Sequence, residues 1–143
     1  MKKQISGALT LAVVALLGGC VAAPTWTNRG HQVVEAKRSG IITCVSDAQI
    51  VEGKRIDAGL CASPNSGWMN DGEPKIQFGP WNMRLIVALE SETTRGVEAE
   101  YDGKKYFLQC SPTFNADKSE KIGLDCKATV NGQLLVSAEF IFK

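Results

Sequence analysis

The residues best equipped for chemistry are five cysteines, at positions 20, 44, 61, 110 and 126, and one histidine, His31. Thiolate and imidazole groups are zinc ligands, but protein zinc sites use closely spaced cysteine pairs or histidine co-ligands. The chain offers no Cys-x-x-Cys pair and only one histidine, so zinc is the minor alternative. Covalent modification and disulfide formation are the other uses open to these thiols, and we expect no metal and no cofactor.

The N-terminus has the layout of an export signal. Lys2 and Lys3 precede an apolar stretch that runs from Ile5 to Leu17. About 13 residues is the length of a signal-peptide core, whereas a membrane-spanning helix needs roughly 20. The stretch ends in Leu17-Gly18-Gly19-Cys20, which resembles the lipobox of bacterial lipoproteins over residues 1–20 only. The alternative is an ordinary cleaved signal with a coincidental cysteine.

The resemblance to bacterial lipoproteins implies that residues 1–19 are removed and that Cys20 carries the lipid. Three acyl chains make a stable anchor, whereas one chain binds a membrane only marginally. Val21 follows the cysteine, which in enteric-type bacteria resembles the sorting signal for the outer membrane; the inner membrane stays open as an alternative. Residues 20–29 form a tether whose nine residues after the cysteine span at most about 30 Å, so the domain must lie near the membrane.

Residues 30–143 have the length of a single domain. Removing Lys2 and Lys3 from the 16 basic residues leaves 14, against 15 acidic residues. This balance provides no electrostatic basis for binding nucleic acid, so we expect none.

The pattern of the domain is that of short strands, because apolar runs rich in Val, Ile, Phe and Tyr alternate with Gly, Asn, Asp and Pro. The expected strands are Gln32–Ala36, Gly40–Val45, Gln49–Glu52, Lys75–Phe78, Asn82–Glu90, Gly96–Tyr101, Lys104–Cys110, Lys121–Val130 and Gln133–Phe142. No window has clear helical periodicity, although Ser46–Val51 is a weak candidate for a short helix or turn. We therefore predict an all-β fold, a small antiparallel sandwich or open barrel formed by a meander of about 7–9 strands.

Two hairpins have registers that can be argued. At Asp102-Gly103 a two-residue type I′ turn pairs Tyr101 with Lys104 and places apolar residues opposite one another. At Asn131-Gly132 the same turn would mix the two faces. We therefore predict a three-residue loop, Val130–Gly132, with a bulge at the glycine.

With Cys20 lipidated, four cysteines remain, and an even number in an exported protein favours two disulfides. Three pairings are possible. Cys110 and Cys126 flank a polar loop and both face the core, so neighbouring antiparallel strands would bring them together. Cys44 and Cys61 then pair by elimination, tying a strand to a loop.

Catalytic patterns are missing from the sequence. We find no nucleophile elbow, no glycine-rich phosphate loop and no Ser-His-Asp set that the spacing supports. Acidic pairs such as Asp57 with Glu73 are typical of solvated surface, and so is His31. We predict that the protein is not an enzyme.

The loop Ala62–Gly72 is long and carries Trp68 and Met69, and a second aromatic turn follows at Trp81. Long loops in compact domains are often functional, and Trp is common in binding sites. These three residues are the candidate binding residues. The bland alternative is that the tryptophans cover one end of the fold.

We therefore expect a non-enzymatic, membrane-anchored periplasmic lipoprotein that binds an envelope protein partner, as an accessory or assembly factor of a secretion, pilus or conjugation system. One alternative is an inhibitor of a periplasmic hydrolase of the lysozyme type, or a lipoprotein that excludes phage or plasmids. Another is a carbohydrate or peptidoglycan-binding module that uses the tryptophans.

Overall fold

The structure is a computed structural model, and it describes residues 27–37, 41–67, 69 and 71–143. Within these ranges the chain forms nine strands and one short helix. Their order is β1 (His31–Ala36), β2 (Thr43–Val51), β3 (Lys54–Ser63), β4 (Lys75–Pro80), β5 (Ile86–Leu89), α1 (Glu90–Arg95), β6 (Val97–Tyr101), β7 (Lys104–Phe114), β8 (Lys121–Val130) and β9 (Gln133–Phe142).

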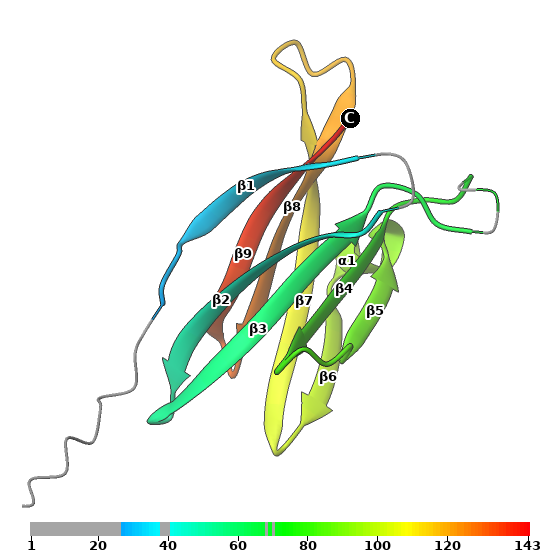
Figure 1. Cartoon of the computed structure of the whole chain (residues 1–143). Helices are drawn as coiled ribbons and strands as arrows, with labels where there is room; N and C mark the ends of the chain where they lie inside the picture. The colour runs from blue at the N-terminus through cyan, green and yellow to red at the C-terminus, as the bar shows by residue number, and fades with distance from the viewer. Residues whose placement is uncertain (1–26, 38–40, 68, 70) are drawn as a thin grey trace, which may run out of the picture.

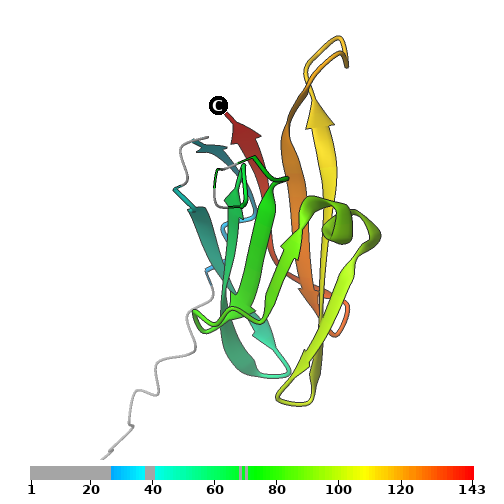
Figure 2. The ribbon, with the colours of Figure 1, turned by 90° about the vertical axis from the view of Figure 1, so that its right-hand side faces the viewer.

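The strands form two sheets that face each other (Figure 1). The larger sheet has five strands in the order β1-β9-β8-β7-β6, and the smaller has four in the order β2-β3-β4-β5. The two layers stand side by side when the molecule is turned by 90° (Figure 2). Every neighbouring pair is antiparallel except β1 and β9, which run parallel. The predicted all-β fold is confirmed, but it is not a simple meander because β1 joins the last strand of the chain.

The core lies between the inner faces of the sheets. Alternate residues of β3 point inward, and Leu60 and Ala62 are fully buried. Phe78 on β4 and Tyr106 on β7 meet across the sheets, with ring centroids 6.1 Å apart. Aromatic side chains bury large apolar areas, so this contact holds the two layers together.

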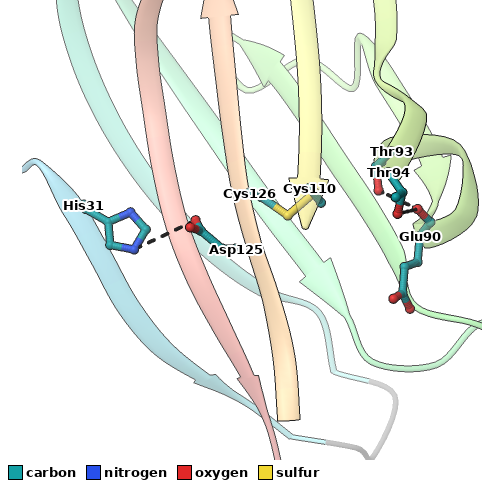
Figure 3. The surroundings of a disulfide bond; sticks show 7 residues. All are labelled: His31, Glu90, Thr93, Thr94, Cys110, Asp125 and Cys126. Atoms are coloured by element: carbon teal, nitrogen blue, oxygen red, sulfur yellow. Dashed lines mark hydrogen bonds and ion pairs between the residues drawn. A yellow bond between two sulfur atoms is a disulfide. The ribbon is translucent and has the colours of Figure 1, made fainter. Parts of the chain in front are cut away.

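Both predicted disulfides form. Cys110 and Cys126 are directly opposite each other on β7 and β8, with Cα atoms 4.0 Å apart, and they lie in the core (Figure 3). Cys44 and Cys61 are also opposed, on β2 and β3, with the same Cα separation of 4.0 Å. Cys61 therefore lies on a strand, and the expectation that it belongs to a loop was wrong.

The strands expected from the sequence did not include β3. The candidate helix or turn at Ser46–Val51 was wrong, because Ser46–Val51 is part of β2. Residues Ile56, Ala58, Leu60 and Ala62 do alternate inward, as strand periodicity requires. The signal is weak because Ala and Gly, which are depleted in strands, fill much of this segment. Glu52 and Gly53, both with positive φ, form the tight turn that joins β2 to β3.

The first predicted hairpin register is confirmed. Tyr101 pairs with Lys104, Ala99 with Tyr106 and Val97 with Leu108. Asp102 and Gly103 have φ values of 50° and 67°, as a type I′ turn requires.

The predicted register of the second hairpin was wrong. The turn is the tight two-residue form, in which Val130 pairs with Gln133 and Asn131 and Gly132 have φ values of 47° and 81°. The register shifts beyond Thr129, so that Ala128 pairs with Val136 and Leu135 is the extra residue. The bulge therefore lies within β9 and not at the turn, and it returns the apolar side chains beyond it to the core face.

A short helix replaces the end of the expected strand Asn82–Glu90. β5 covers only Ile86–Leu89, and α1 starts at Glu90. The backbone N–H of Leu89 donates to the Glu92 carboxylate at 2.7 Å, which satisfies a donor at the helix start. α1 has only six residues and buries only Thr93, so it is too short to show a helical period in the sequence.

Candidate functional site

A groove of about 420 Å³ crosses the outer face of the four-stranded sheet. Its floor is built by residues of β2, β3 and β4 that alternate away from the core. They are the Cys44–Cys61 disulfide, Ser46, Gly59, Gln77 and Gly79. We call it the Gly59 groove.

Two glycines in register shape the floor. Gly59 on β3 is paired with Gly79 on β4. A Cβ atom added at Gly59 would meet nothing within 4 Å, so the space in front of this residue is open. A Cβ atom added at Gly79 would lie 1.9 Å from the carbonyl oxygen of Met83. The chain after β4 therefore folds directly onto Gly79 and raises a wall beside the hollow at Gly59.

The two walls come from opposite sides of the sheet. Asn82, Met83 and Arg84 form one wall. The second wall contains residues of the segment that enters and forms β1, together with Ile42; they are Arg29, Gln32 and Val34.

Hydrogen bonds to β2 fix the second wall. The backbone N–H of Arg29 donates to both carboxylate oxygens of Asp47, at 3.0 and 3.1 Å. The side-chain amide of Gln32 donates to the carbonyl oxygen of Ser46 at 3.2 Å. Thr27 and Arg29, which the sequence placed in the tether, are therefore held against the domain.

The groove is positively charged. Arg29 and Arg84 are exposed, and its lining contains no Asp or Glu. In the part of the chain that the structure describes, neither guanidinium pairs with a carboxylate. The remaining polar side chains are amides and one hydroxyl, from Gln32, Gln77, Asn82 and Ser46. This lining can bind and orient a ligand, but it presents no general base.

The structure does not bring the predicted binding residues together. Trp81 is 52% exposed at the end of β4, beside the groove wall that starts at Asn82. Met69 is 71% exposed in the loop that precedes β4. The six residues of β4, a strand about 20 Å long, lie between the two positions in the chain. Trp68 lies outside the described residues.

His31 has partners that its position in the sequence did not suggest. Its Nδ1 lies 3.2 Å from Ser137 Oγ. Its Nε2 lies 3.9 Å from Asp125 Oδ1, a contact drawn in Figure 3. The contacts form because β1 pairs with β9, whose other neighbour is β8. Ser137 is only 4% exposed, and the distance to Asp125 exceeds a hydrogen bond. These contacts tie β1 to its sheet and leave Ser137 closed to a substrate.

The predicted signal peptide and Cys20 lie outside the described residues. Among the residues that the structure does describe, no helix has the length and apolar character to cross a membrane. Nor do three His, Cys, Asp or Glu side chains gather there in a way that would hold a metal ion.

Comparison with protein-family models, with curated proteins and with solved structures found no match to this chain. The site therefore has to be interpreted from its own geometry.

The binding residues predicted from the sequence did not include Arg29, Gly59 or Arg84. A signal for Gly59 was present, because the alternation from Ile56 to Ala62 places Gly59 and Cys61 on the outward face. The two arginines carry no comparable signal, since only the fold brings the start of β1 and the chain after β4 to the same groove.

Proposed function

We propose that this protein is a non-enzymatic lipoprotein, anchored through Cys20 at the periplasmic face of the outer membrane, whose β domain binds an envelope protein through the Gly59 groove. The Leu17–Cys20 motif supports the anchor. Two disulfides suit an oxidising compartment, where such bonds form and persist.

The observation that carries the binding role is the construction of the groove. Its floor is braced by a disulfide, and hydrogen bonds that Arg29 and Gln32 donate to Asp47 and Ser46 hold one wall. A preformed site avoids part of the ordering cost of association. A binding domain held close to the membrane suits an accessory or assembly factor of a secretion, pilus or conjugation system.

The partner is tested with full-length protein purified from cross-linked, detergent-solubilised envelopes. Gly59→Leu fills the groove without meeting any protein atom at its Cβ, and Gly59→Ala is the matched control that leaves most of the space. We expect the wild-type protein and Gly59→Ala to co-purify the same envelope protein, and Gly59→Leu to lose it. A partner retained equally by all three proteins, or no reproducible partner, would refute the binding role.

The anchor is tested separately by labelling cells with radioactive palmitate and fractionating their membranes. We expect label on the wild-type protein in the outer membrane and none on Cys20→Ser exported with an ordinary cleavable signal, which should appear in the soluble periplasmic fraction. Equal membrane retention of Cys20→Ser would contradict the lipid anchor and leave the groove unaffected as a binding site.

A second candidate function, inhibition of a periplasmic hydrolase, is favoured by the β7–β8 hairpin. This hairpin projects beyond the other strands in both views (Figures 1 and 2). Its tip is braced by hydrogen bonds from Asn115 N–H to the Glu120 carbonyl at 3.0 Å and from the Ser119 hydroxyl to Asp117 at 2.6 Å. Phe114, next to the tip, is 49% exposed. A rigid projecting loop is suited to entering an enzyme cleft.

The inhibitor function is tested in a lysozyme activity assay with the purified protein. Inhibition that Phe114→Ala weakens and Gly59→Leu leaves intact would favour this function over groove binding. No inhibition at a large excess of protein would exclude lysozyme as the target.

A further inference from the structure

The lining of the Gly59 groove specifies the charge of its ligand. Arg29 stands on one wall and Arg84 on the other, and the lining has no carboxylate to neutralise them. Guanidinium groups bind carboxylates through two parallel hydrogen bonds, which are stronger than bonds between neutral groups. A ligand with separated negative charges would satisfy both walls.

The remaining lining distinguishes between an extended peptide and a sugar. Amides from Gln32, Gln77 and Asn82 can serve a peptide backbone, since each carries both donors and an acceptor. Sugar sites usually add an exposed aromatic platform. The exposed Trp81 is beside the groove but not part of its lining, and the one aromatic residue in the lining, Phe78, is 1% exposed. Met83 and Val34 supply apolar contacts for side chains. These features favour a peptide.

We propose that the Gly59 groove binds an extended acidic segment of the partner protein, with its carboxylates on Arg29 and Arg84. This inference rests on the proposed binding function and specifies the chemistry of the partner. Because both arginines are exposed, binding should weaken as salt is raised.

The test uses full-length protein in detergent and a random heptapeptide library displayed on phage. We expect enrichment of peptides that carry Asp or Glu at separated positions. Arg29→Gln and Arg84→Gln should each weaken the enriched peptides about tenfold, since each removes a charge-assisted pair. Gly59→Leu should abolish their binding. Lys127→Gln, an exposed position on the other sheet, is the charge-matched control and should leave affinity unchanged.

The Arg29→Gln variant should keep the wall in place, because Asp47 binds the backbone N–H of Arg29 and not its side chain. Selection of neutral or basic peptides, acidic peptides that survive Gly59→Leu, or no enrichment at all would overturn the inference. If the envelope partner is lost with Gly59→Leu but retained with both arginine variants, groove binding stands and the acidic ligand is wrong.

Discussion

The two disulfides place their sulfur atoms in different environments. Cys110 and Cys126 are 1% and 0% exposed, whereas Cys44 is exposed on the floor of the Gly59 groove. Thiol–disulfide exchange requires direct attack on a sulfur atom, so access controls its rate.

We expect a small dithiol reductant to open Cys44–Cys61 in the folded protein while Cys110–Cys126 stays closed. Alkylation followed by mass spectrometry measures both rates. Equal rates for the two bonds under native conditions would contradict the assignment of one bond to the surface and the other to the core.

Each bond should also stabilise the fold. The chain-entropy model assigns about 3 kcal/mol to loops of this size, with sequence separations of 16 and 17. Replacing Cys110 and Cys126 by Ala should cost more than replacing Cys44 and Cys61, because it also leaves a cavity in the core. Chemical denaturation of the two double variants measures the difference, and a larger loss for the surface pair would contradict it.

Asp117 provides a residue-scale test of the hairpin tip. Hydrogen bonds from the Ser119 hydroxyl and backbone N–H hold the pKa of this carboxyl below its ordinary value. The lowered pKa means that the carboxylate stabilises the tip at neutral pH and loses this effect as pH falls through its folded pKa. Ser119→Ala should raise the pKa toward the ordinary value, which an NMR titration of the Asp117 carboxyl carbon measures. An unchanged pKa would contradict the role of the Ser119 hydroxyl in lowering it.

At the scale of elements, Gly59 and Gly79 form a matched pair on neighbouring strands. Gly79→Ala should lower the free energy of unfolding by about 1–3 kcal/mol, because the new methyl group overlaps the Met83 carbonyl. Gly59→Ala should change it by no more than about 0.5 kcal/mol, or stabilise the strand. Urea denaturation measures both. Equal effects of the two substitutions would contradict the groove wall described above.

The two hairpins show when sequence patterns are enough to predict the register of paired strands. The Asp102-Gly103 register was predictable because turn chemistry and the facing of side chains agree there. At Asn131-Gly132 the two signals conflict, and the chain keeps the preferred turn and moves the irregularity to Leu135. Turn chemistry decided the outcome because a bulge can absorb the extra residue within β9.

At the scale of the whole molecule, Asp47 joins the two sheets. It is 5% exposed on β2 and accepts the backbone N–H of Arg29, the residue that leads into β1 of the other sheet. Asp47→Ala should cost about 1–3 kcal/mol, because it removes the acceptor for the Arg29 N–H and for the buried Ala48 N–H. Amide hydrogen exchange should rise across β1. Asp47→Asn keeps an acceptor and should cost less, and equal exchange in β1 for all three proteins would contradict this role.

The overall architecture and the disulfides were predictable, whereas the groove was not. Alternation and cysteine parity depend on local spacing, which a single sequence records. The groove depends on long-range placement, since Arg29 and Arg84 are brought together only by the docking of the β1 entry segment and the loop after β4. The same limit applies to His31, whose partners Asp125 and Ser137 are far away in the chain.

The most direct test of the account is photo-crosslinking in living cells, with p-benzoylphenylalanine placed at position 83 on the groove wall or at position 127 on the outer face of the larger sheet. The account predicts that position 83 crosslinks one envelope protein and that position 127 does not. Crosslinking of that partner from position 127 alone, or from neither position, would contradict binding through the Gly59 groove.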